Sequence, residues 1–171
     1  MSDFLTLAKA RYSCRQFSDA PVTKEELDSI LAAVKGAPSA HNDQPYRIWI
    51  CESEDALARI RQCTKYHFHA PLVLIVGYKK DEAWVRPYDE KQFGEVDAAI
   101  VGAHILFAAH DIGLGSTWVA YYEPAKVAEL FPETEGYEVL SLFPIGHPST
   151  EAHPAPLHTV RRPEEELIFR L

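Results

Sequence analysis

A short segment near the N-terminus carries two arginines and a serine at alternate positions. Arg11, Ser13 and Arg15 stand in the pattern R-x-S-x-R. In an extended backbone, alternate side chains point to the same side, so this segment would offer two guanidinium groups and a hydroxyl to one phosphate. Two solvated arginines and a capping serine explain the same residues when the motif is taken alone. The phosphate site is therefore a hypothesis that needs support from elsewhere in the chain.

A polar loop between an expected helix and an expected strand is the second candidate. It runs Ala37-Pro38-Ser39-Ala40-His41-Asn42-Asp43-Gln44-Pro45-Tyr46. Serine, asparagine and glutamine supply neutral donors and acceptors, and two prolines stiffen the backbone. Such groups suit the edge of a flavin ring, with its carbonyls and ring nitrogens. Ordinary turn chemistry explains the loop equally well.

A glycine-rich turn follows the most apolar helix that we expect. Gly113 and Gly115 precede Ser116, Thr117 and Trp118. Glycine lets a backbone approach a flat cofactor closely. The turn is not a dinucleotide fingerprint, because it lacks a third glycine and follows a helix instead of a strand. Taken alone, it is most simply the end of a helix.

The tail contributes a further pair of arginines. Arg161 and Arg162 precede Pro163, after a stretch from His147 to Pro156 that contains three prolines. Either arginine could complete a phosphate clamp with Arg11 and Arg15, although tail arginines are usually solvated. The prolines argue against packed elements, so residues 147–171 are expected to form an extended C-terminal arm.

The histidines and cysteines do not indicate a metal site. His67 and His69 alternate as they would on one strand face, but two ligands without a third favour a structural or solvated pair. Cys14, Cys51 and Cys63 are odd in number and form no C-x-x-C pair. This argues against a disulfide framework and fits a reducing cytoplasm.

Two helices are predicted strongly. Thr23 and Glu26 have the spacing of a capping box. Apolar residues then recur at helical spacing up to Gly36, at Leu27, Ile30, Leu31 and Val34. The second helix begins near Phe93 and ends at Gly113. Small residues line much of it, which predicts a central helix that neighbours approach closely and makes it a candidate for a subunit contact.

The remaining elements are short. Residues rich in β-branched and aromatic side chains predict strands over Arg47–Cys51, Leu72–Tyr78, Thr117–Tyr122 and Tyr137–Ile145. Weaker helices are expected in the first ten residues, over 54–64, over 124–131 and from Glu164. Helices and strands do not alternate strictly along the chain, so the expected fold class is α+β, with a mixed, mostly antiparallel central sheet flanked by helices.

Composition narrows the class of protein. The 171 residues suit a single domain, and the net charge of −8 disfavours a nucleic-acid binder. The start, Met1-Ser2-Asp3-Phe4, lacks the pattern of a secretory signal. The apolar stretch from Ala98 to Ala109 is too short to cross a bilayer, so no membrane partner is expected.

The order of these segments carries more information than any one of them. R-x-S-x-R is followed by A-P-S-x-x-N-x-Q-P, then by D-A-A-I-V from Asp97, then by G-L-G-S-T-W and finally by R-R-P. In this order the sequence resembles the nitroreductase family of flavoproteins over nearly its whole length.

The resemblance implies a nitroreductase-like α+β fold and an intertwined homodimer with FMN at the subunit interface. It implies that Arg11, Ser13 and Arg15 bind FMN and that Arg161 or Arg162 is the tail's phosphate ligand. It further implies that Pro38, Ser39 and Asn42 reach the flavin of the other subunit, and that Gly115, Ser116 and Thr117 line the rest of the ring.

The function implied is reduction of a nitroaromatic, quinone or related small-molecule acceptor with electrons from NADH or NADPH. Because the flavin carries the hydride chemistry, no catalytic nucleophile or base is demanded of the protein. Two alternatives stay open: another flavin reaction, such as reductive dehalogenation or flavin breakdown, and a non-catalytic FMN-binding protein for storage or sensing.

Overall fold

An antiparallel sheet of four strands forms the centre of the fold, in the order β1-β2-β4-β3. The strands are β1 (Tyr46–Cys51), β2 (Leu72–Tyr78), β3 (Gly115–Ser116) and β4 (Glu138–Gly146). The computed structural model describes residues 3–171, so Met1 and Ser2 of the expected N-terminal helix lie outside the described residues. The α+β class is confirmed, but the four named strands pair only antiparallel; the parallel pairing is an isolated bridge from Ser13 to Ser116.

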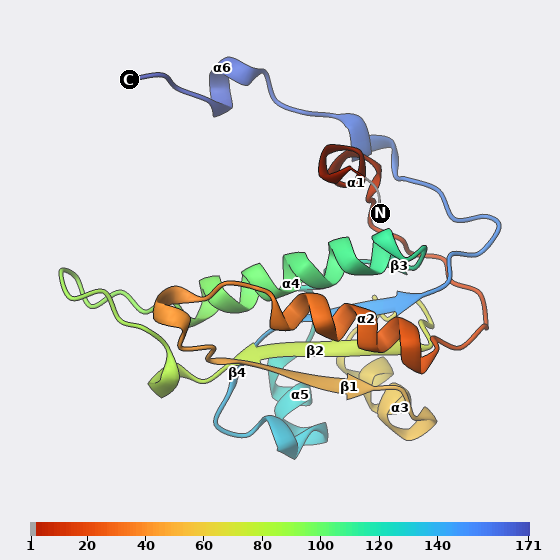
Figure 1. The fold of residues 1–171 in the computed structure, drawn as a ribbon. Helices are drawn as coiled ribbons and strands as arrows, with labels where there is room; N and C mark the ends of the chain where they lie inside the picture. Colours follow the sequence, from red (N-terminus) through yellow and green to blue (C-terminus); the bar gives the residue numbers. More distant parts are fainter. Residues whose placement is uncertain (1–2) are drawn as a thin grey trace.

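Helices cover both faces of the sheet (Figure 1). On one face lie α2 (Lys24–Lys35) and α4 (Gly94–Asp111), and on the other lie α3 (Glu54–Cys63) and α5 (Pro124–Leu130). Helix α1 (Phe4–Ala10) lies beyond α4, where the rings of Phe4 and Phe107 are 5.7 Å apart. The expected helices over 54–64 and 124–131 are confirmed.

Strand β2 is buried on both faces because each face is covered by helices. The side chains from Leu72 to Val76 are at most 1% exposed. Leu74 packs toward α2 and α4, whereas Ile75 packs toward α3 and α5. This explains why β2 is a continuous apolar run and not an alternating one.

The capping box predicted for α2 is present. Thr23 Oγ1 accepts a hydrogen bond from Glu26 N at 3.2 Å, and Glu26 Oε2 accepts one from Thr23 N at 2.8 Å. Leu27, Ile30 and Val34 are the buried residues of this helix. The apolar spacing therefore located both the start of the helix and its buried face.

Helix α4 makes the close contacts that its small residues predict. A Cβ atom added to Gly102 would lie 2.6 Å from the ring of Trp118 and 2.7 Å from that of Phe143. No bulkier residue fits without moving these rings. Helix α4 is the longest helix of the described chain, and it links the two ends of the molecule where the candidate residues lie (Figure 1).

The strand predicted over Thr117–Tyr122 is wrong. Pairing is confined to β3, which ends at Ser116, and to an isolated bridge between Val119 and Leu142. The aromatic residues that suggested a strand are used for tertiary contacts instead. Trp118 packs on the ring of Phe143 at 4.9 Å, and the Tyr122 hydroxyl donates to Val139 O at 2.6 Å.

The chain after His147 runs over the surface and then away from the sheet (Figure 1). It contains a 3-10 turn at Pro156–Thr159 and the short helix α6 (Glu164–Leu167). The helix start expected at Glu164 is therefore confirmed.

Candidate functional site

The segment that follows α1 is extended, as the R-x-S-x-R pattern requires. Cys14 points inward and is fully buried, while Ser13 is half-buried and Arg15 is exposed. Cys14 N donates to Ser116 O at 3.0 Å, which joins the segment to β3. Arg15 Nη1 donates to Ser13 O at 3.1 Å. Because neighbours in an extended chain alternate, Ser13 and Arg15 both face away from the side that buries Cys14.

The glycine-rich turn lies directly under this segment. A Cβ atom on Gly115 would lie 2.6 Å from Cys14 Sγ and 2.7 Å from Cys14 Cβ. Ser116 and Thr117 are only 2% and 3% exposed. Their burial favours a role in supporting the arginine segment over direct contact with a ligand.

The C-terminal arm meets the arginine segment at its 3-10 turn. His158 Nε2 donates to Lys9 O at 3.2 Å, and the rings of His158 and Tyr12 lie 6.4 Å apart. Arg161 Nη1 donates to His158 O at 2.6 Å, so the Arg161 side chain lies beside His158. Arg162 instead pairs with Glu166 at 3.6 Å, further along the arm. The structure thus brings His158 to the N-terminal segment and leaves Arg161 next to this contact on the arm.

His110 does not add a permanent positive charge to this junction. The pKa of His110, whose ring lies 6.4 Å from that of Tyr12, is lowered by burial and by the nearby Arg11 guanidinium. Burial, with a smaller contribution from Cys14, raises the pKa of Tyr12. Both groups are neutral at pH 7, so the permanent charge here is that of the arginines.

The polar loop from Pro38 to Gln44 lies at the other end of α4. Ala40 N donates to the carboxylate of Asp97 at 2.9 Å, and Asp97 is in the first turn of α4. Pro38 and Asn42 are exposed, and Ser39 is half-buried, with its Oγ accepting from Gln44 N at 3.1 Å. The loop therefore presents a polar surface beside the N-terminus of α4.

Within one chain, the predicted residues form two groups that do not meet. Asp97 contacts the polar loop at one end of α4, and His110 lies near Arg11 at the other end of the same helix. At 1.5 Å per residue, these positions are roughly 20 Å apart along α4. Figure 1 shows the same separation: α1 lies over the C-terminal end of α4, and the loop after α2 lies at its N-terminal end.

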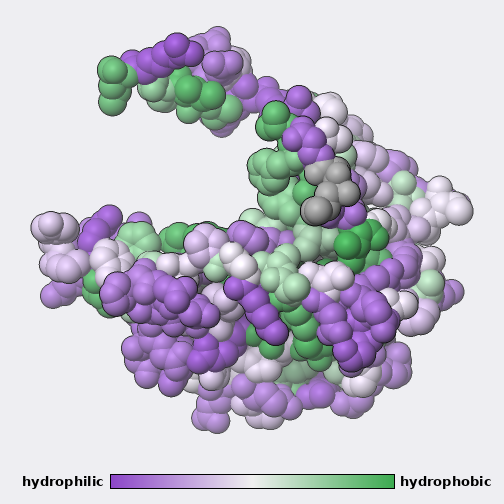
Figure 2. Space-filling model, viewed as in Figure 1, coloured by the Kyte–Doolittle hydropathy of each residue, from purple (hydrophilic) through white to green (hydrophobic). Residues whose placement is uncertain are grey.

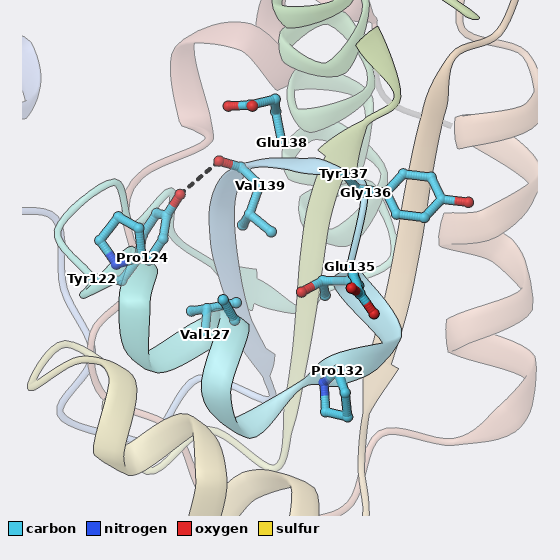
Figure 3. Close-up of a pocket in the computed structure, with 11 residues that line it drawn as sticks. Tyr122, Pro124, Val127, Pro132, Glu135, Gly136, Tyr137, Glu138 and Val139 are labelled. Atoms are coloured by element: carbon cyan, nitrogen blue, oxygen red, sulfur yellow. Dashed lines mark hydrogen bonds between the residues drawn. The ribbon is translucent and has the colours of Figure 1, made fainter. Parts of the chain in front are cut away.

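A cavity of about 660 Å³ lies away from both groups, between α5 and the start of β4. Tyr122, Val127, Tyr137 and neighbouring residues line it (Figure 3). Because α5 packs on the face of the sheet opposite α4, this cavity contains no predicted site residue. A second cavity, of about 630 Å³, runs along α4 between α1 and α2, and its lining is mostly apolar: Phe4, Leu7, Ile100, Ala103 and Phe107 contribute to it.

The histidine pair lies in a turn and not on a strand. The rings of His67 and His69 are 4.4 Å apart, and His67 Nδ1 accepts from His69 N at 3.0 Å. Within residues 3–171, no group of three or more His, Cys, Asp or Glu side chains is placed to hold a metal ion. In the same range, no helix has the length and apolar character needed to cross a bilayer.

The structure adds site residues that sequence reasoning did not single out. Tyr12 and His158 form the junction between the N-terminal segment and the arm. Asp97 binds the polar loop across 57 positions of sequence. A carboxylate inside an apolar helix was the available signal for Asp97, because buried charges are rare without a specific partner. No local signal marked His158.

Sequence comparison finds relatives of this chain among proteins named as flavin reductases. An NAD(P)H-dependent FMN reductase from Bacillus subtilis is 27% identical over 90% of this chain and 67% of its own length. An NADPH-flavin oxidoreductase from Vibrio harveyi is 28% identical over 94% of this chain and 73% of its own.

Solved structures extend the comparison to the fold. A nitroreductase family protein from Clostridium difficile 630 superposes with a TM-score of 0.91, at 32% identity, over 98% of both chains. A protein from Exiguobacterium sibiricum solved in complex with FMN superposes with a TM-score of 0.84 at 21% identity, over 100% of this chain and 98% of its own. The sequence model of the family described as Nitroreductase matches residues 8–68 and 64–147, and the chain belongs to the nitroreductase family.

Proposed function

We propose that this protein is an FMN-dependent oxidoreductase that takes electrons from NADH or NADPH and reduces nitroaromatic, quinone or related electron-poor acceptors. Family membership and the activities of the B. subtilis and V. harveyi relatives support this function. The observation that carries it is the junction beside the segment of Arg11, Ser13 and Arg15, where His158 of the arm binds Lys9 O and accepts a hydrogen bond from Arg161.

This donor set fits the phosphate of FMN. Guanidinium groups bind a phosphomonoester through paired, charge-assisted hydrogen bonds. The charge is permanent because arginine is not deprotonated near neutral pH. Ser116 holds the segment in place through the bond from Cys14 N to Ser116 O, and Gly115 leaves room for the Cys14 side chain. FMN, when bound, supplies the hydride chemistry, while these residues bind and orient it.

A second copy of the chain is needed to complete the site. Pro38, Ser39 and Asn42 lie roughly 20 Å from the arginine junction of their own chain, measured along α4. We assign them to the flavin of a partner subunit in a homodimer. Two copies related by a twofold axis across α4 would bring the loop of each to the junction of the other.

Two surfaces support this dimer. The apolar groove along α4 has no cover in a single chain. The arm carries exposed apolar side chains toward its end, including Leu167 at 57%, Ile168 at 60% and Phe169 at 73% exposure. Figure 2 shows the arm standing clear of the body with an open space beneath it. Apolar surface of this kind is typically buried by a partner.

The cytoplasm suits this protein, because Cys14, Cys51 and Cys63 are all free and buried.

The test is an anaerobic titration of the purified protein with NADH and NADPH, followed by a screen of acceptors. We expect a yellow dimer whose flavin absorbance bleaches with one or both donors and recovers when an acceptor is added. A yellow protein that neither donor bleaches would reject the reductase and leave FMN storage or sensing. A colourless monomer that ignores added FMN would reject every flavin function.

The phosphate site is tested with Arg11→Ala. Loss of a charge-assisted hydrogen bond, worth about 1.5 to 3 kcal/mol, should weaken FMN binding about 10- to 100-fold. Arg61→Ala is the matched control, because Arg61 pairs with Glu54 on α3, beneath the opposite face of the sheet. Equal FMN affinity in the two variants would contradict the assignment.

A further inference from the structure

Asp97 is a buried carboxylate in the first turn of α4. It is 1% exposed, and its Oδ1 accepts the hydrogen bond from Ala40 N at 2.9 Å. Its Oδ2 is also buried and has no hydrogen-bond partner among the described residues. Burial raises the pKa of Asp97, which the Ala40 N–H partly opposes and Asp43 reinforces. An apolar side chain here would avoid burying this polar group.

The loop that Asp97 holds has an unfavourable backbone conformation. His41, Asn42 and Gln44 have φ angles of 55°, 60° and 51°, in the left-handed region that non-glycine residues rarely occupy. Bonds inside the loop, such as Asn42 N to Ser39 O at 3.0 Å, shape the turn but do not attach it to the rest of the fold. The Ala40–Asp97 bond makes that attachment to α4.

Neither feature is explained by stability alone. The buried Asp97 Oδ2 without a hydrogen bond destabilises the fold, and so do the three residues with left-handed φ angles. Both features belong to the same turn and its contact with α4. Conformations of this kind persist where the surrounding structure holds them for a function. The turn also carries Pro38, Ser39 and Asn42, which the proposed function assigns to the flavin.

We propose that Asp97 is a positioning residue: by binding Ala40 N it fixes the turn from Pro38 to Gln44 against the N-terminus of α4, so that the turn is already ordered to receive the flavin of the partner subunit. This inference rests on the proposed function. Asp97 is buried behind the turn, and it acts through the backbone of Ala40 and not by touching the ring.

The test compares variants of Asp97 in the full-length, flavin-free protein. Asp97→Ala removes the acceptor and should weaken FMN binding about 10-fold or more. Asp97→Asn keeps an oxygen for Ala40 N and should stay within about threefold of the wild type. Hydrogen exchange should show faster exchange of the Ala40 amide in Asp97→Ala and not in Asp97→Asn.

A control separates positioning from general loss of stability. Thr64 is 6% exposed, and its hydroxyl donates to Tyr121 O at 2.5 Å, on the α3 side of the molecule. Thr64→Val removes this bond and the one that Thr64 Oγ1 accepts from Tyr66 N at 3.1 Å, but it should leave FMN affinity unchanged. If it weakens FMN as much as Asp97→Ala does, or if Asp97→Ala binds FMN like the wild type, the proposal is overturned.

A second variant covers the case in which Asp97→Ala does not fold. Ala40→Pro removes the same N–H from the other partner, and proline suits the first position of the short helix that Ala40 begins. It should weaken FMN to a similar degree, and unchanged affinity would overturn the proposal. A wild-type protein that binds no FMN at all defeats the proposed function and this inference together, whereas a binding wild type with unaffected variants defeats only the inference.

Discussion

Gly115 is the position where a single methyl group should disturb both folding and cofactor binding. Its missing Cβ makes room for Cys14, whose Sγ and Cβ would lie 2.6 Å and 2.7 Å from an added methyl. Pro148 Cγ would lie 3.2 Å away on another side. Gly115→Ala must therefore push the arginine segment away from β3.

The size of the effect follows from these distances. Non-bonded carbons prefer separations near 3.5 to 4.0 Å, so Cys14 would have to move by about 1 Å. Overpacking of this kind destabilises proteins by about 1 to 3 kcal/mol. For a chain of this length, that corresponds to a fall in Tm of about 2 to 12 °C. Because Ser13 and Arg15 flank Cys14, FMN binding should weaken by about 10-fold or more.

Thermal unfolding and FMN titration of the same samples test this reasoning. Gly36→Ala is the matched control: Gly36 has a φ of −85°, and its nearest contact to an added Cβ is an ordinary 3.5 Å. Cys14→Gly combined with Gly115→Ala removes the clash and should recover part of both losses, a coupling that independent sites do not show. A Gly115→Ala protein with the Tm and FMN affinity of the wild type would refute the argument.

Three further outcomes are expected. The hydrogen bond from Thr23 N lowers the pKa of Glu26, so Glu26→Gln should reduce the free energy of unfolding at pH values above the ordinary carboxyl pKa. This loss should disappear as the pH falls through the lowered pKa of Glu26 in the folded protein. Urea unfolding at several pH values measures the loss, and a loss that does not change with pH would contradict the prediction. Burial raises the pKa of Cys51 to about 12 and that of Cys63 to about 11. Both thiols should therefore fail to react with an aromatic disulfide reagent at pH 8 until the protein is unfolded, and rapid reaction of the native protein would count against their burial. FMN should strengthen dimerisation, because a ligand that contacts both subunits binds the dimer better than the monomer; sedimentation of dilute protein that is insensitive to FMN would argue against a shared site.

Most helices and three strands were predictable because their signals are local. The Thr23–Glu26 box and the stripe after it need only neighbours in the same helix. The unbroken apolar run of β2 predicted its bounds, Leu72–Tyr78, because both faces are buried. The Thr117–Tyr122 prediction was wrong because aromatic and β-branched residues indicate burial, and here burial comes from packing against Phe143 and not from strand pairing.

The candidate site was predictable in its residue types but not in its layout. The patterns around Arg11 and Ser39 show which groups could bind a phosphate or a polar ring. They do not show that Cys14 locks the first segment to Ser116, or that His158 brings the arm to Lys9. Those contacts join positions far apart in sequence, and each is made by a residue with no distinctive local pattern.

Helix α4 explains why the two halves of the site could not be assembled from one chain. It is rigid and 18 residues long, so it holds the loop at Asp97 and the arginine junction near His110 at a fixed separation of roughly 20 Å. The same separation becomes useful when two antiparallel copies pack along α4, because each end of one helix then lies beside the opposite end of the other. In the homodimer proposed above, the length of this helix would therefore decide which residues serve the chain's own cofactor and which serve its partner's.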